Sequence, residues 1–118
     1  MNKYERLINE LSHREGTNPS MKVFGNSMLP IIKSGSLLTF KKEKSYQIND
    51  IVFCKVKGRY IDAHKITKTD GNARYMIANN GGYENGWTKT IFGRVIRTEK
   101  KNEIREFKRK NNECKTQN

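Results

Sequence analysis

The chain has 118 residues, of which 34% are hydrophobic, enough for one domain with a modest core. Its 24 Lys and Arg against 12 Asp and Glu give a formal net charge of +12, so an acidic partner has to be considered. The N-terminus lacks the apolar core of a signal peptide, and no apolar run approaches the ~20 residues of a membrane span. We therefore expect a cytoplasmic protein with no membrane span.

Residues 1–20 are expected to form a helix and a linker. Apolar residues recur at helical spacing within residues 2–13, at Tyr4, Leu7, Ile8 and Leu11. This stripe is expected to dock on the body of the domain. Residues 16–20, Gly-Thr-Asn-Pro-Ser, then break the helix.

Short β-rich runs separated by turn signals follow. The expected strands are 21–24, 37–40, 51–56, 59–66, 73–78 and 90–96, the last with Gly93 as a candidate bulge. Lys-Gly at 57–58 and Asp-Gly at 70–71 predict tight turns, and residues 79–87 a loop. The pattern predicts a mainly β fold, a small antiparallel domain over residues 21–107 with a short N-terminal helix.

The C-terminal part gives weaker signals. Ile104 and Phe107 fit either a helix or an edge strand, and residues 108–118 are expected to be a polar, disordered tail. Cys54 lies in an apolar run and is interpreted as a core residue, whereas Cys114 lies in the tail. Their spacing matches no metal site and fits a reducing compartment at least as well as a disulfide. We expect no metal and no cofactor.

Ser27 lies on a constrained turn between Gly25 and Pro30. Pro30 fixes its own φ and restricts the residue before it, so the turn orients the Ser27 hydroxyl reproducibly. Serine is a weak nucleophile that needs a base, and His64 is the candidate base that titrates near neutral pH. Each residue alone also fits a structural role, Ser27 in a turn and His64 in a half-buried strand.

Four motifs in order resemble one family. Residues 25–30, Gly-Asn-Ser-Met-Leu-Pro, resemble the Gly-x-Ser-Met-x-Pro nucleophile box of the serine peptidases that include signal peptidases and LexA-type repressors. Residues 49–52, Asn-Asp-Ile-Val, resemble the family's Gly-Asp-Ile-Val segment. Residues 63–66, Ala-His-Lys-Ile, fall at its general base, and residues 92–95, Phe-Gly-Arg-Val, resemble its closing Gly-x-Val strand. The resemblance implies a LexA/signal-peptidase-like β fold.

The resemblance also implies a Ser27–His64 dyad. The family's base is a lysine in the LexA and bacterial signal-peptidase branches and a histidine in the endoplasmic-reticulum and archaeal branches. His64 matches the histidine branch, with its neighbour Lys65 as a fallback. A histidine base needs an orienting group. In the histidine branch this group is an aspartate, and asparagines stand near its position here. The candidate orienting residues are Asn79, Asn80, Asp62 and Glu84.

Substrate is expected to bind as an added strand beside residues 21–24. The Ser27 backbone N–H is expected to stabilise the oxyanion. The expected substrate-binding residues are apolar: Met21, Val23, Met28 and Leu29. An apolar patch of this kind also fits simple core packing.

The sequence therefore predicts a serine peptidase that cleaves another polypeptide through a Ser-His dyad. It is expected to lack a signal peptidase's membrane anchor and a repressor's DNA-reading domain, which would suit a phage or mobile-element protein. The alternative is a catalytically inactive member of the fold that binds nucleic acid or protein through its basic surface. A hydrogen bond between Ser27 and His64 would favour the enzyme. Weak nucleic-acid binding is compatible with both, and the oligomeric state is not predicted.

Overall fold

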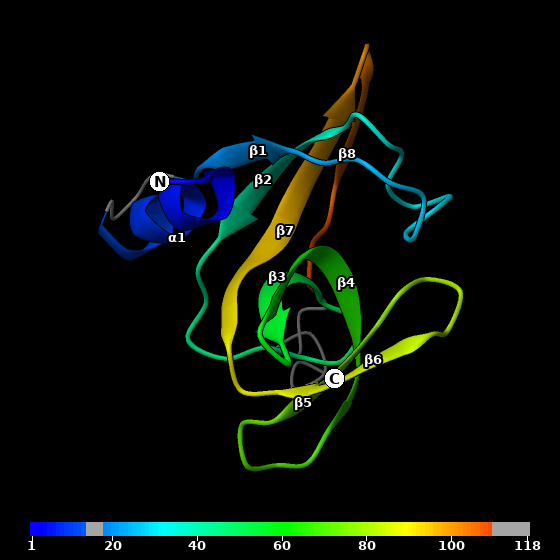
Figure 1. Cartoon of the computed structure of the whole chain (residues 1–118). Helices are drawn as coiled ribbons and strands as arrows, with labels where there is room; N and C mark the ends of the chain where they lie inside the picture. Colours follow the sequence, from blue (N-terminus) through cyan, green and yellow to red (C-terminus); the bar gives the residue numbers. More distant parts are fainter. Residues whose placement is uncertain (14–17, 110–118) are drawn as a thin grey trace, which may run out of the picture.

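The computed structural model describes residues 1–13 and 18–109 (Figure 1). These residues form one helix and eight strands: α1 (Lys3–His13), β1 (Ser20–Lys22), β2 (Leu37–Lys41), β3 (Ile51–Val56), β4 (Arg59–Thr69), β5 (Tyr75–Ala78), β6 (Glu84–Thr88), β7 (Ile91–Lys100) and β8 (Glu103–Glu106). Residues 14–17 of the expected linker and 110–118 of the expected tail, with Cys114, lie outside the described ranges. The expected fold class, a mainly antiparallel β domain with a short N-terminal helix, is confirmed.

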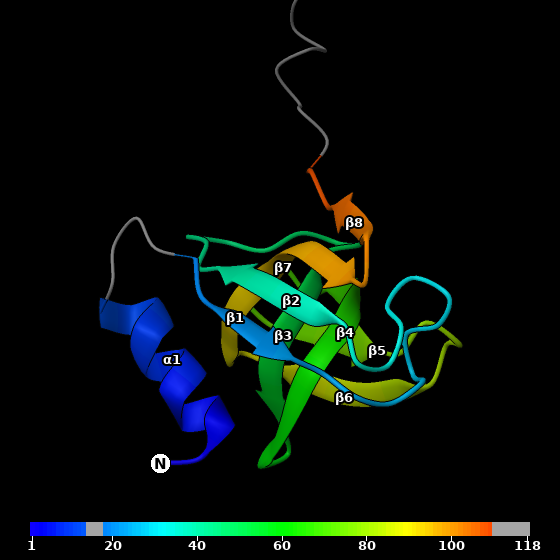
Figure 2. The ribbon, with the colours of Figure 1, turned by 90° about the horizontal axis from the view of Figure 1, so that it is seen from above.

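All paired strands are antiparallel, in the order β1-β2-β7-β3-β4-β5-β6, with β8 added to β7. The sheet is strongly curled. Figure 2 shows β1, β2 and β7 crossing over β3 and β4, with α1 beside β1. The curl brings the segment after β1 close to β4, although three strands separate the two in the sheet order.

The N-terminal helix begins with a reciprocal cap. The Glu5 backbone N–H donates to Asn2 Oδ1 at 2.9 Å, and the Asn2 N–H donates to Glu5 Oε1 at 3.0 Å. The apolar stripe docks as expected, because Leu7 and Leu11 are buried in the main core. A Cβ at Gly93 of β7 would lie 3.2 Å from Leu11 Cδ1, so this glycine allows the helix to approach the sheet.

The core has two parts. The larger part joins α1 to the turn around Ser27 and to strands β1, β2, β3, β4 and β7. It includes Phe40, Phe53 and Val95, none of which is exposed. The smaller part lies around Val52, Cys54 and Ile66. Cys54 is fully buried, as expected. Burial also raises the pKa of its thiol to about 12, so this group stays protonated.

Three local expectations need correction or completion. Residues 84–88 form β6 rather than a loop, although Asn85 and Gly86 are weak strand formers, because the segment pairs with β5. The segment of Ile104 is an edge strand, β8, which resolves the alternative. Arg109, which the sequence assigned to the tail, pairs with buried Asp50 at 2.7 Å.

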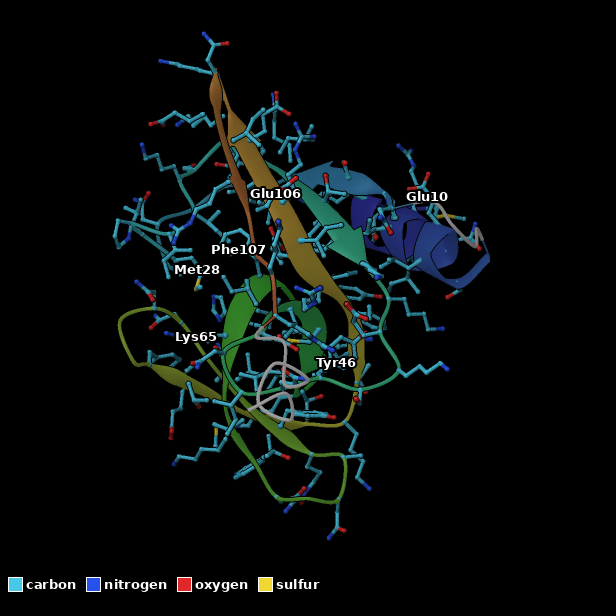
Figure 3. The ribbon with its side chains drawn as sticks, turned by 180° about the vertical axis from the view of Figure 1, so that it is seen from behind. Glu10, Met28, Tyr46, Lys65, Glu106 and Phe107 are labelled. Carbon is cyan, nitrogen blue, oxygen red and sulfur yellow. The ribbon has the colours of Figure 1, made fainter. Side chains whose placement is uncertain are left out.

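Figure 3 shows Glu106 and Phe107 where β8 ends and the chain turns toward Tyr46. The Arg109 guanidinium lies over the Tyr46 ring and donates to the Ser45 carbonyl at 2.8 Å. This C-terminal segment therefore anchors the connection between β2 and β3. Within the described ranges, no helix has the length and apolarity that crossing a membrane requires.

Candidate active site

Ser27 lies on a turn that is fixed from both sides. Before the turn, the Val23 N–H donates to the Ser36 carbonyl and the Gly35 N–H to the Val23 carbonyl, which holds the chain beside the start of β2. Gly25 has φ +113°, a region that favours glycine. After the turn, the Ile32 N–H donates to the Met28 carbonyl at 2.9 Å. The Ser27 side chain is left exposed at the surface.

The turn places Ser27 against the middle of β4. Ser27 Oγ lies 3.0 Å from His64 Nε2, which is hydrogen-bonding distance. The fallback base Lys65 is the next residue on the strand, but the nitrogen within hydrogen-bonding distance of Ser27 Oγ belongs to His64. The structure thus brings together the two residues that the sequence singled out for nucleophile and base.

The second nitrogen of His64 contacts a residue that the sequence reasoning missed. His64 Nδ1 lies 2.7 Å from Oδ1 of Asn85 on β6. An amide oxygen only accepts hydrogen bonds, so Nδ1 carries the proton. In a neutral imidazole Nε2 is then unprotonated and accepts the hydrogen bond of the Ser27 hydroxyl. The order Ser27–His64–Asn85 therefore has the donor and acceptor pattern of a catalytic triad with asparagine as third member.

The surroundings of His64 favour its neutral form. Burial lowers the pKa of His64 from its usual 6.5, and this effect exceeds the opposite effects of the Asn85 hydrogen bond and the Asp62 charge. A histidine that is neutral at physiological pH has a free lone pair on Nε2. It can therefore accept a proton from Ser27.

Asn79 and Asn80, two of the four expected orienting residues, make other contacts instead, and those of Asn80 are with the turn around Ser27. The Asn80 backbone N–H donates to the Ser27 carbonyl at 3.0 Å, and its side-chain Nδ2 donates to the Leu29 carbonyl at 2.8 Å. Asn79 stabilises the loop of residues 79–83, because its Oδ1 accepts from the Tyr83 N–H at 2.9 Å. Asn80 therefore holds the nucleophile turn rather than the imidazole.

The other two candidates also do not bond to His64. Glu84 pairs with Lys68 at 3.2 Å. Asp62 lies two residues before His64, a spacing that in a regular strand places both side chains on one face. The register between β3 and β4 shifts at this point, which disturbs the alternation of faces. Asp62 instead interacts with the Tyr4 hydroxyl, whose pKa is raised to about 12 mainly by burial and further by Asp62.

A cleft of about 300 Å³ opens beside Ser27 and His64. It lies between the chain before Ser27, the strand before His64 and the first turn of α1. Its lining consists of Tyr4, Val23, Phe24, Gly25, Ser27, Met28, Ile32, Tyr60, Ile61, Asp62, Ala63 and His64. The dyad thus faces a cavity large enough for a side chain of a substrate.

The expected substrate-binding residues fall into two groups. Val23 and Met28 line the cleft while being largely buried in the core. Met21 does not line it, because its side chain is buried and faces a separate groove between α1 and β1. Leu29 is 43% exposed and also lies outside the cleft lining. Of the four expected residues, Val23 and Met28 therefore line this cleft, whereas Met21 and Leu29 do not.

Across residues 1–13 and 18–109, no group of three or more His, Cys, Asp or Glu lies close enough together to hold a metal ion.

A family model described as Peptidase S24-like matches residues 2–96, which is most of the chain. The chain belongs to the Peptidase S24-like family. The matched region contains the nucleophile turn, His64 and Asn85, so all three positions lie within the shared part of this Peptidase S24-like chain. The match confirms the family resemblance that the four sequence motifs indicated. A search of curated proteins gives no significant match.

Proposed function

We propose that this protein is a serine endopeptidase that hydrolyses a peptide bond of another polypeptide through Ser27 and His64. The observation that carries the proposal is the 3.0 Å contact between Ser27 Oγ and His64 Nε2 at the edge of a cleft. The Peptidase S24-like family supports a polypeptide as the substrate class. The same contact favours the enzyme over a binding module of the same fold.

In the proposed reaction, His64 Nε2 takes the proton of Ser27 as Oγ attacks the substrate carbonyl carbon. The protonated imidazole then gives this proton to the leaving amine, and the C–N bond breaks to leave an acyl-enzyme. A water molecule then loses a proton to His64 and attacks the ester carbonyl, and His64 returns this proton to Ser27 Oγ as the acyl C–O bond breaks and the carboxylic acid product leaves. Asn85 keeps the imidazole in the required tautomer, but as a neutral group it stabilises the imidazolium less than a carboxylate would.

The developing oxyanion needs a fixed hydrogen-bond donor. In the described ranges the Ser27 backbone N–H has no hydrogen-bond partner, while the Ser27 carbonyl is held by Asn80. The N–H is therefore free to bind the oxyanion. Its peptide plane, which it shares with the Asn26 carbonyl, is held by the hydrogen bond from the Leu29 N–H to that carbonyl at 3.2 Å.

A substrate strand has two backbone edges to pair with. Val23 directs its N–H and carbonyl toward residues 35 and 36, so the backbone groups of Phe24 point the other way. Across the cleft, β4 pairs with β5 only from Lys65 onward, which leaves the edge of Ile61–Ala63 open on that side. An extended peptide between Phe24 and this part of β4 would place its carbonyl near Ser27.

The proposal is tested by incubating the full chain with a mixture of unfolded proteins and identifying new termini by mass spectrometry. The proposal predicts new termini with the wild type and none above background with Ser27→Ala. Equal cleavage by the two proteins would show that any activity comes from a contaminant.

A further inference from the structure

The charge inside the cleft differs from the charge of the rest of the chain. Lys and Arg make up 24 of 118 residues, yet within residues 1–13 and 18–109 none of them is among the twelve residues that line the cleft. Asp62 is the only carboxylate in that lining. A strongly basic protein therefore presents an acidic cavity next to its nucleophile.

We propose that Asp62 makes this cleft a subsite for a lysine or arginine side chain adjacent to the scissile bond of the substrate. This inference rests on the proposed function, because it names the substrate class of the Ser27–His64 site. It assigns Asp62 a role in specificity, separate from the orientation of His64.

The Asp62 carboxylate is available for such a contact. No Lys, Arg or His within residues 1–13 and 18–109 forms a salt bridge with it. Its polar interaction is with the Tyr4 hydroxyl, which faces the same cleft. A half-buried carboxylate without a cationic partner gains from a charge-assisted hydrogen bond when a cationic side chain enters.

The walls of the cleft suit the stem of a long side chain. The rings of Tyr4 and Tyr60 stack with centroids 4.8 Å apart, and both line the cleft with Ile61 and Val23. The aliphatic part of lysine or arginine can pack on such apolar surface while its charged end reaches a polar group. A cavity of about 300 Å³ has room for one side chain of this size.

Two lysines already lie near these rings. Lys3 Nζ is 5.1 Å from the Tyr4 centroid, and Lys55 Nζ is 4.8 Å from the Tyr60 centroid. Both lysines are outside the cleft lining and neither is within salt-bridge distance of Asp62. The positive charges of Lys3 and Lys55 repel a substrate cation from the parts of the Tyr4 and Tyr60 rings that they cover. The place in the cleft where such a cation is stabilised is therefore beside Asp62.

The experiment uses the full chain and three peptides that differ only at the residue next to the scissile bond. This residue is lysine, methionine or glutamate. The methionine peptide has a similar length without the charge. The inference predicts a kcat/KM for the lysine peptide about ten times that of the methionine peptide, as one charge-assisted hydrogen bond provides. Rates are compared at pH 8, where His64 is neutral whether or not the Asp62 charge is present.

Asp62→Asn should lower the ratio of kcat/KM between the lysine and the methionine peptide from about ten to about one. The matched control is Glu106→Gln, which changes the net charge equally at the exposed end of β8 (Figure 3) and should keep the preference. A lysine preference that survives Asp62→Asn, or equal rates for the lysine and methionine peptides with the wild type, would overturn the inference.

A serine-directed fluorophosphonate probe separates this inference from the proposed function. Labelling of Ser27 together with an unchanged peptide preference in Asp62→Asn would leave the peptidase in place and refute the subsite. If Ser27 is not labelled, the peptidase proposal fails, and the subsite is then tested by binding. In that case Ser27→Ala should bind the lysine peptide about ten times more tightly than Ser27→Ala/Asp62→Asn, and equal affinity would refute the subsite.

Discussion

Ser27 Oγ and His64 Nε2 are 3.0 Å apart although 37 positions separate the two residues in the chain. Ser27 follows β1 at one edge of the sheet, and His64 is in β4, with β2, β7 and β3 between them in the sheet order. The contact therefore depends on the curl of the whole sheet and on the fixed turn after Gly25. It is a product of the tertiary structure rather than of local sequence.

Removal of either member of the dyad should abolish turnover. Ser27→Ala and His64→Ala are each expected to reduce kcat at least about 10³-fold, because nucleophile and base act as a unit. The matched control is Lys65→Ala, on the same strand, which should keep kcat within about three-fold. Peptide hydrolysis and thermal unfolding should be measured for all three. Loss of activity in Lys65→Ala with full activity in His64→Ala would assign the base to the lysine.

The residue at position 85 should affect the pKa of His64. In the wild type, His64 Nδ1 lies 2.7 Å from the neutral amide oxygen of Asn85. Asn85→Asp puts a negative charge in that place and should therefore raise the pKa of His64. The acidic limb of the pH–rate profile should therefore move to higher pH. Asn85→Ala should lower kcat roughly 10- to 100-fold through loss of the hydrogen bond. An acidic limb at the same pH in Asn85→Asp and wild type would show that Asn85 does not contact the titrating base.

The wild-type pH dependence follows from the burial of His64. Because its pKa in the folded protein is lowered from 6.5, activity should rise with pH and reach half its maximum below pH 6.5. The unfolded chain binds a proton more readily than the folded protein. The contribution of His64 to stability is therefore complete above pH 6.5 and is lost as the pH falls toward the folded-state pKa.

Urea unfolding of wild type and His64→Gln between pH 5 and 8 measures this effect. The free energy of unfolding of the wild type should fall more steeply with decreasing pH than that of His64→Gln. Parallel curves would mean that the pKa of His64 is the same in the folded and unfolded states.

Asn80 should affect catalysis more than stability. Asn80→Ala removes the 2.8 Å hydrogen bond from the side chain to the Leu29 carbonyl and loosens the turn that carries Ser27. We expect kcat to fall about ten-fold and the free energy of unfolding to fall by about 1 kcal/mol or less. Asn79→Ala is the control, because it removes the neighbouring bond to the Tyr83 N–H without touching the turn. Equal losses of kcat in the two variants would argue against a specific role for Asn80.

The protein should not cleave its own N-terminal segment. Leu7 and Leu11 of α1 are buried in the core, and Met21 and Val23 are held beside β2 and Ser36, so these described parts of the N-terminal segment are not free to enter the site. Incubation of the purified protein alone at mildly alkaline pH, followed by intact-mass analysis, should show one unchanged species. A concentration-independent loss of an N-terminal fragment, absent in Ser27→Ala, would contradict this prediction.

Much of this structure could be predicted because its signals are local. The stripe at Leu7 and Leu11, the β-rich run 51–56 and the Lys-Gly turn at 57–58 each depend on a few adjacent residues, and all three appear in the structure. Ser27 and His64 were found because a nucleophile and a base are chemically distinctive and match family motifs.

Asn85 could not be found in the same way. Its segment contains Asn85 and Gly86, which weaken a strand signal, and β6 forms because β5 and the turn at 57–58 approach it closely. Gly86 has φ +136°, a region that favours glycine, and a Cβ there would lie 3.3 Å from Val56 Cγ1, so a larger residue would be strained at this position. The sequence analysis named Asn79, Asn80, Asp62 and Glu84 as candidate orienting groups. Each is close in the chain to Asn85 or to His64, but none of them bonds to His64 Nδ1 in the structure.

The most direct measurement is the intact mass after treatment with a fluorophosphonate probe at pH 8. The account predicts one adduct per chain, located on Ser27 by peptide mapping, and slower labelling by at least about 100-fold in His64→Ala. Absence of the adduct in wild type, or equal labelling rates in wild type and His64→Ala, would contradict the claim that His64 activates Ser27.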